Sequence, residues 1–340
     1  MNVDLSTRYL GQNLVNPLGA SAGPLTGRLD SLRRLQDAGA AVAVLPSLFE
    51  EQIQHDEQEL ERLYEYQAES FAESLSFFPE LENYNTGPRG YLKYLETAKR
   101  AVSIPLIGSL NGCSSSGWVR YAKAIQNAGA DALELNIYFV PTNPEMTSTD
   151  VENRYVQLVA QVCQSVSIPV GVKLGQNFSS LPHFARRLVY AGAAGLVLFN
   201  RYLEADIDLE SLTFKPDLIL SHRHEARVPI RWIAILRDQI NASLAATGGV
   251  HRTQGIIKLL LAGADVTFMT SVLLLKGPDF LRTLLVDLAR WLEEHEYSSV
   301  EQLKGSMSRG NAPDPGQLER ANYMQALIEY SPHRREPHFD

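Results

Sequence analysis

The chain has 340 residues, of which 45% are hydrophobic and 21% are charged, and this is an ordinary globular composition. Its formal net charge of −8 argues against a nucleic acid as the main partner, because such a partner requires a basic surface. The two cysteines, Cys113 and Cys163, are too few for a disulfide framework or for an iron–sulfur cluster held by this chain alone.

The N-terminal residues Met1–Asp4 lack the basic and apolar regions of a signal peptide. No run approaches the roughly 18 apolar residues of a membrane span. We therefore expect a cytoplasmic protein in a reducing compartment, with neither a membrane nor a nucleic acid as its partner.

A repeated unit dominates the chain. Four helical patterns end in Ala-Gly-Ala and lead into a β-rich run, and their glycines are Gly39, Gly129, Gly192 and Gly263. Two further runs share the entry Ser-Ile-Pro. The eight predicted strands are Asn16–Ala22, Ala41–Leu45, Leu106–Ser109, Ala132–Asn136, Val170–Lys173, Gly195–Phe199, Leu244–Thr247 and Val266–Met269.

Helical patterns alternate with these strands. They include Ser31–Ala38, Tyr91–Ala101, Trp118–Ala128, Val151–Ser165, Leu181–Ala191 and Thr253–Ala262. Alternation of this kind predicts a parallel sheet, and eight units in succession predict an α/β fold, the (β/α)8 TIM barrel. An open doubly wound sheet is the alternative, but no Gly-x-Gly-x-x-Gly follows the first strand.

Several segments lie outside the plain barrel. Leu5–Leu14 predicts a small hairpin before the first strand. Long insertions follow the second strand, at Glu50–Arg89, and the sixth, at Leu203–Ile230. Further helices are predicted within Pro278–Tyr330. We expect a barrel over residues 1–297, a helical extension over 298–330 and a flexible tail over 331–340.

The carboxyl ends of the strands carry the chemistry of such a barrel. They are rich in serine, threonine, asparagine and glycine, with one lysine and no carboxylate. This composition disfavours a glycosidase and a catalytic metal, and no Ser-His-Asp pattern is evident.

Lys173 stands at the exit of the fifth strand, within Ile168–Gly175. A lysine here is either a solvated strand-end charge or part of a site. Gly248 and Gly249 after strand seven, with Thr270 and Ser271 after strand eight, form a candidate phosphate cradle. The alternative for these four residues is a tight turn and a helix cap.

Asparagines follow three different strands, at Asn111, Asn136 and Asn200. Their amides could bind a planar ligand that forms hydrogen bonds. A single strand-end asparagine is more often a turn residue.

Asn16–Gly23, Gly171–Leu174, Thr247–Val250 and the strand-eight motif through Thr270-Ser271 resemble the dihydroorotate dehydrogenase family of FMN-dependent barrels. The resemblance runs from about Leu5 to about Tyr297. It implies FMN, a homodimer and a place in pyrimidine biosynthesis. It also implies that Lys173 and Asn136 are catalytic. The implied flavin contacts are Ala20, Ser21, Ser47, Ser109, Asn136, Lys173, Asn200, Gly248, Gly249, Thr270 and Ser271, and the implied substrate contacts are Asn85, Asn111, Asn136 and Asn200.

The chain also departs from the family pattern. Phe139 stands where the family has a cysteine or serine base, and Pro46 stands where it has a lysine. The substrate loop is loosely matched by Asn83–Pro88, and a glycine pair is not evident at Ser221–His224. Candidate substitute bases are Tyr138, His55, Tyr84, His222 and His224, although lone residues of these types are more often solvated or core residues than catalytic bases.

Three functions follow from this pattern. The first is an FMN oxidoreductase that transfers a hydride between the flavin and a small planar substrate such as dihydroorotate. The second is a non-redox, phosphate-binding barrel, with Lys173 as the Schiff base of a lyase. The third is a flavoprotein without its own substrate, whose acidic segment Glu50–Leu75 docks a basic redox partner.

Overall fold

The computed structural model describes residues 3–53, 87–112, 117–201, 205–216 and 218–319. Eight parallel strands form a closed barrel, as predicted, in the order β11-β12-β3-β4-β5-β6-β7-β8. The barrel strands are β3 (Leu18–Ala20), β4 (Val42–Phe49), β5 (Leu106–Gly112), β6 (Ala132–Ile137), β7 (Val170–Leu174), β8 (Gly195–Leu198), β11 (Ser243–Thr247) and β12 (Val266–Met269).

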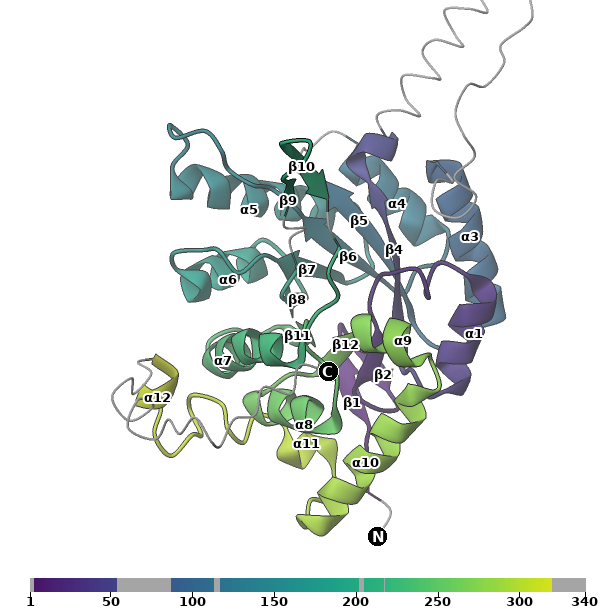
Figure 1. The fold of residues 1–340 in the computed structure, drawn as a ribbon, viewed down its shortest axis with the longest axis vertical. Coiled ribbons are helices and arrows are strands. Elements are labelled where there is room, and N and C mark those ends of the chain that lie inside the picture. The colour runs from purple at the N-terminus through teal and green to yellow at the C-terminus, as the bar shows by residue number, and fades with distance from the viewer. Residues whose placement is uncertain (1–2, 54–86, 113–116, 202–204, 217, 320–340) are drawn as a thin grey trace, which may run out of the picture.

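Helices surround the barrel on its outer side (Figure 1). They are α1 (Leu29–Asp37), α3 (Pro88–Ala101), α4 (Trp118–Asn127), α5 (Ser148–Ser165), α6 (Leu181–Tyr190), α7 (Arg227–Leu236), α8 (Thr253–Ala262), α9 (Ser271–Lys276) and α10 (Phe280–Glu294). The four Ala-Gly-Ala glycines have φ between 97° and 118°, which confirms that each ends its helix in the left-handed region.

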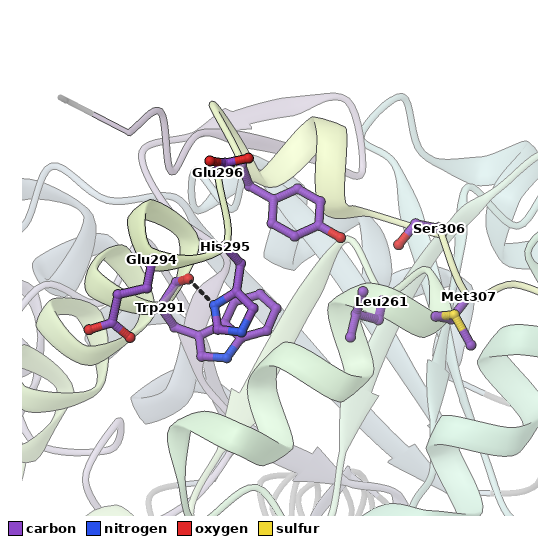
Figure 2. A pocket seen from close by; sticks show the side chains of 8 residues that line it. Leu261, Trp291, Glu294, His295, Glu296, Ser306 and Met307 are labelled. Atoms are coloured by element: carbon purple, nitrogen blue, oxygen red, sulfur yellow. Dashed lines mark hydrogen bonds between the residues drawn. The ribbon is translucent and has the colours of Figure 1, made fainter.

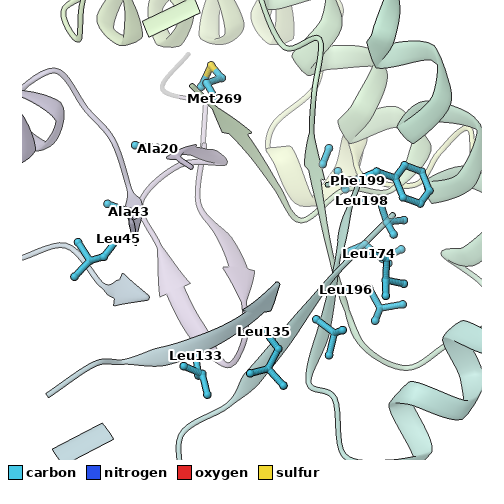
Figure 3. Close-up of a cluster of buried hydrophobic side chains, with 14 of the residues drawn as sticks. Ala20, Ala43, Leu45, Leu133, Leu135, Leu174, Leu196, Leu198, Phe199 and Met269 are labelled. Carbon is cyan, nitrogen blue, oxygen red and sulfur yellow. The ribbon is translucent and has the colours of Figure 1, made fainter. Parts of the chain in front are cut away.

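Alternate side chains along each strand point outward or inward. The outward residues pack under the helices in one large core, and Figure 3 shows part of it, including Leu133, Leu135, Leu196 and Leu198. The inward residues form a second, smaller core that includes Val42, Ile107, Ala132, Val197 and Phe268. The barrel is therefore filled by side chains at the amino-terminal end of its strands.

An N-terminal hairpin of β1 (Thr7–Tyr9) and β2 (Gln12–Leu14) closes the amino-terminal end of the barrel, and the sequence predicted it correctly. Tyr9 and Leu10 are each 2% exposed and belong to the inner core. A Cβ at Gly195 would lie 2.7 Å from Leu10 Cδ2, so glycine at this position makes room for the hairpin.

Several predicted boundaries were wrong, among them those of β4 and of the second insertion. Strand β4 continues to Phe49 rather than ending at Leu45, through an irregularity in its pairing with β5 between Val44 and Ser47. The second insertion is shorter than predicted, because α7 already begins at Arg227. Before α7 the insertion forms a hairpin of β9 (Ala205–Asp208) and β10 (Thr213–Pro216) and a 3₁₀ turn, η1 (Arg223–Ala226).

The chain after α10 packs back onto the barrel. Short helices α11 (Val300–Leu303) and α12 (Gly316–Glu319) follow, and the backbone N–H groups of Gly305 and Met307 donate to the end of α8. Lys304 lies 3.0 Å from Asp265, just before β12. Among the described residues, no helix is both long and apolar enough to cross a lipid bilayer.

Candidate functional site

Lys173 reaches across the interior of the barrel. It is 8% exposed on β7, and its Nζ lies 3.5 Å from the Ser21 hydroxyl, just after β3. Strands β3 and β7 are four strands apart in an eight-stranded barrel, so this contact must pass through the lumen. The lysine is therefore a buried cation inside the barrel mouth, not a solvated strand-end charge.

A carboxylate contacts this ammonium group from the amino-terminal side of the barrel lumen. Glu134 on β6 is 2% exposed, and its Oε1 lies 3.4 Å from Lys173 Nζ. The sequence analysis missed Glu134, because it considered only residues at the strand ends. The sequence does indicate Glu134 as an inward residue. In Leu133-Glu134-Leu135-Asn136 the acid alternates with leucines and shares the inward face with Asn136.

Asn136 is next to Lys173 in the β6–β7 register and next to Asn111 in the β5–β6 register. Its side chain is 7% exposed, and its Oδ1 is buried without a hydrogen-bond partner among the residues that the structure describes. An unsatisfied buried amide oxygen costs about 1–3 kcal/mol in the unliganded protein. It marks a place where a ligand with a hydrogen-bond donor would be stabilised.

Two serines line the neighbouring strands. Ser47 Oγ and Ser109 Oγ are 2.8 Å apart, and Ser109 is paired with Glu134 in the β5–β6 register. The Ser109 N–H donates to the buried hydroxyl of Tyr91, whose pKa is raised by burial. Ser21, Ser47, Ser109, Asn136 and Lys173 were predicted to share a site, and the structure brings them to the same end of the barrel lumen.

The predicted phosphate cradle has open space beside one of its two glycines. Gly248, at φ 91°, has open space where a Cβ would stand. At Gly249, with φ 73°, a Cβ would lie only 2.3 Å from the Ala226 backbone nitrogen. The loop after β11 is thus open on one side and covered on the other by the segment 218–226.

Ser271 opens α9, a helix of only six residues, and its hydroxyl accepts a hydrogen bond from the Ser221 N–H at 3.0 Å. Ser221 Oγ lies 3.0 Å from Nε2 of His251, which the sequence analysis did not single out. Burial lowers the pKa of His251. Ser271 is therefore already tied to the covering segment through its hydroxyl oxygen.

The remaining predicted contacts are more peripheral. The Ala20 side chain is 1% exposed and lies in the outer core, so only its backbone faces the site. The Asn200 N–H donates to the Leu174 carbonyl, and the asparagine side chain is half-buried. Thr270 is the residue before α9 and makes no side-chain cap there, although its Cγ2 closely approaches Gly23. Asn85, Tyr84 and His55 lie outside the described residues.

The positions of the absent base and the absent second lysine are apolar. Phe139 follows β6 and lies under the guanidinium of Arg154, at 4.5 Å from its ring centroid. Pro46 lies at the irregularity of β4 and touches the position of Gly27. Neither side chain can exchange a proton.

Extending β4 to Phe49 brings Glu50 to a strand exit, which corrects the expectation that no carboxylate stands there. Glu50 is 7% exposed and lies against Gly112 and Trp118. Gly112 is on the outward-facing register of β5, so Glu50 lies behind the sheet, not in the lumen. Among the described residues, no group of three histidine, cysteine or acidic side chains could hold a metal ion.

A surface groove of about 540 Å³ lies elsewhere, between α8 and α10 (Figure 2). Trp291 and His295 stack along it, and Leu261 near the end of α8 forms part of its wall. In a (β/α)8 barrel the carboxyl-terminal ends of the helices lie at the amino-terminal side of the strands, opposite the catalytic face. This groove is therefore separate from the site around Lys173.

The buried ammonium, the unpaired amide oxygen and the open glycine loop fit a planar ligand that carries a phosphate group. A family model described as dihydroorotate dehydrogenase matches residues 4–292 of the chain. A relative from Thermoplasma acidophilum, named dihydroorotate dehydrogenase B (NAD(+)), catalytic subunit, is 23% identical over 89% of this chain and 98% of its own length. A relative of the same name from Listeria monocytogenes serotype 4b is 28% identical over 66% of this chain and 73% of its own length.

Proposed function

The chain belongs to the dihydroorotate dehydrogenase family, and on this premise we propose that it is an FMN-dependent oxidoreductase acting on CH–CH groups. Its substrate would be a dihydropyrimidine or another small planar molecule. The reaction would transfer a hydride between that molecule and the flavin N5.

One observation carries this proposal: within the described part of the chain, Asn136 Oδ1 is buried without a partner beside the Lys173 ammonium. Lysine has three N–H donors, and two of those of Lys173 face Ser21 and Glu134. Among the described residues the third has no partner. A donor and an acceptor are thus both open at one end of the lumen, as a flavin ring requires.

FMN bound at this site would supply the two-electron carrier. Lys173 would provide positive charge that stabilises the negative charge of the reduced ring. Asn136 would orient the ring or the substrate through its amide. The Gly248–Gly249 loop and Ser271 would hold the phosphate through backbone N–H groups and one hydroxyl.

Proton transfer is where this chain differs from its relatives. Phe139 is apolar and packs under Arg154, so it cannot remove a proton from the substrate carbon. Loss of a general base slows a reaction by about 10²–10⁴-fold. We therefore propose that dihydroorotate is at best a slow substrate, and that the physiological substrate either needs no base from this loop or takes one from another residue.

The Schiff-base alternative is less well supported. An imine-forming lysine must present a free amine to its substrate, whereas Lys173 Nζ is already ion-paired with Glu134 at 3.4 Å and contacts the Ser21 hydroxyl. A flavoprotein without its own substrate remains compatible with the loss of the base. It would share the flavin site and differ only in the reduction experiment described below.

We also propose a homodimer. The β9–β10 hairpin and the residues after it expose Leu209, Leu212, Phe214 and Leu218, each at 76–80%. Apolar side chains that gather on one exposed element mark a protein–protein contact. The relatives named as catalytic subunits leave a separate redox partner as a further prospect.

The test is anaerobic reduction of the FMN-loaded chain by a panel of dihydropyrimidines and reduced nicotinamides, followed by visible absorption. The proposal predicts that at least one compound bleaches the flavin within seconds, and that dihydroorotate acts at least 10²-fold more slowly than in a base-containing relative. A flavin that no member of the panel reduces would favour the protein without its own substrate.

A further inference from the structure

We propose that Glu134 is a positioning residue that fixes the Lys173 ammonium and lowers the reduction potential of the bound flavin. The inference rests on the proposed FMN site. It adds a carboxylate that acts through the lysine and does not itself need to touch the flavin.

Glu134 lies inside the barrel lumen, on the amino-terminal side of the proposed flavin site. It is two residues before Asn136 on β6 and faces the same way, so it lies roughly 6–7 Å closer to the amino-terminal end of the barrel. In the register it is paired with Gly171, two residues before Lys173 on β7. The lysine side chain must therefore bend back toward the carboxylate to make the 3.4 Å contact.

On the amino-terminal side of Glu134, the barrel lumen is filled by side chains of the N-terminal hairpin. Gly171 has no side chain, and a Cβ there would meet Leu10 and the Tyr9 hydroxyl at 3.4 and 3.6 Å. Burial, and after it the charge of Glu134, raises the pKa of Tyr9. Glu134 is also 2% exposed, so water screens its charge very little.

The charges determine the sign of the effect. Two-electron reduction adds negative charge to the flavin, and a lone buried ammonium would stabilise that charge strongly. A carboxylate on the same ammonium offsets part of this stabilisation. Glu134 should therefore make the flavin harder to reduce, while holding Lys173 in one position between Ser21 and the ligand.

A matched control exists in the chain. Glu152 on α5 is 8% exposed and is paired with Arg187 at 3.0 Å, outside the barrel. Glu152→Gln also breaks a partly buried ion pair, but this pair lies between the outer helices α5 and α6 and not in the lumen. It reports what the structural loss alone does to the flavin.

The experiment measures the FMN midpoint potential of each protein at pH 6. We expect Glu134→Gln to shift the oxidised-to-reduced equilibrium about tenfold or more toward reduced flavin, which is about 30 mV upward for a two-electron couple. Glu134→Asp, which keeps the charge but shortens the side chain, should give a smaller upward shift. Glu152→Gln should give none.

Two results would overturn the inference. One is a Glu134→Gln protein that binds FMN with an unchanged potential. The other is an equal shift in Glu152→Gln. If Glu134→Gln does not fold, the Glu134→Asp potential decides in the same way, and no shift there contradicts the role. A wild-type chain that takes up no FMN would instead overturn the proposed function itself.

Discussion

At the scale of single residues, the site is a set of buried polar groups that are only partly paired. Lys173 pairs with Glu134 but keeps one open N–H, and Asn136 Oδ1 has no partner within the part of the chain that the structure describes. Proteins retain an unsatisfied buried group where a ligand or a reaction uses it. Asn136 therefore links the stability of the unliganded chain to its affinity for FMN.

Asn136→Leu should move these two quantities in opposite directions. Replacing an unpaired amide by an apolar group of similar shape should leave the free energy of unfolding of the unliganded protein unchanged or raise it by about 1 kcal/mol. The same change should weaken FMN binding about tenfold, since one hydrogen bond is lost. Denaturant unfolding and an FMN titration measure the two effects.

Asn16 provides the control for this pair of measurements. Its amide is fully used, because it donates to the Gly39 carbonyl and accepts from the Leu18 N–H, both at 2.9 Å. Asn16→Leu should destabilise the fold by about 2 kcal/mol and leave the FMN affinity unchanged. Equal destabilisation by both substitutions would contradict the ligand role of Asn136.

Phe139 allows a test by gain of function. Phe139→Cys restores a group that can accept a proton at the family position, and general bases contribute about 10²–10⁴-fold. We expect bleaching of the flavin by dihydroorotate to become at least 10²-fold faster. Val140→Cys, one residue further along and 52% exposed, is the control and should have no such effect.

At this scale the sequence predicted the inward serines, Asn136 and Lys173, because each stands at a strand exit. It could not predict Glu134 by that rule, since Glu134 lies within a strand and its partner is 39 residues away. An acid inside an otherwise apolar strand is unfavourable without a partner. Asking which cation could pair with it would have led to Lys173.

At the scale of elements, the repeat determined the eight strands, but their lengths depended on contacts between strands. Leu45 was predicted as the end of β4, and Pro46, which lacks an N–H, would favour an end at this point. The strand resumes after an irregularity, because Ser47 and Leu48 pair with β5. That pairing is a tertiary contact and is invisible in the local sequence.

The segment 218–226 makes stability depend on pH through His251. Burial lowers the pKa of His251, so the unfolded chain binds a proton more readily than the folded one. The stabilisation is present above the unfolded value of about 6.5 and is lost as the pH falls below it. We expect the melting temperature to fall between pH 7 and pH 5, and His251→Gln to reduce this fall.

His183 on α6 is exposed and serves as the control histidine. His183→Gln should leave the pH dependence of the melting temperature unchanged. An unchanged dependence in His251→Gln as well would show that other groups cause the acid destabilisation.

The N-terminal hairpin closes the amino-terminal end of the barrel. It is therefore part of the core, although it lies outside the repeated strand–helix units. Leu10→Ala should lower the free energy of unfolding by about 2–5 kcal/mol, because it leaves a cavity between Gly171 and Gly195. Denaturant unfolding measures this loss. Val15→Ala, at a site 73% exposed just after the hairpin, should change it by less than about 0.5 kcal/mol.

At the scale of the whole molecule, the exposed leucines and phenylalanine of the β9–β10 region predict self-association. Phe214 is 78% exposed, and Phe214→Glu would place a charge in the proposed contact. Sedimentation should show a wild-type dimer and a monomeric variant. Tyr190→Glu changes an equally exposed aromatic residue on α6 and should leave the dimer intact, so a dimer that survives Phe214→Glu would contradict this contact.

The central claim is that the carboxyl-terminal end of the barrel binds FMN around Lys173 and Asn136. The most direct measurement is the visible absorption spectrum of the purified chain during titration with FMN. The account predicts a yellow protein with one FMN per chain, and weaker binding after Asn136→Leu. A colourless chain that takes up no FMN would contradict it.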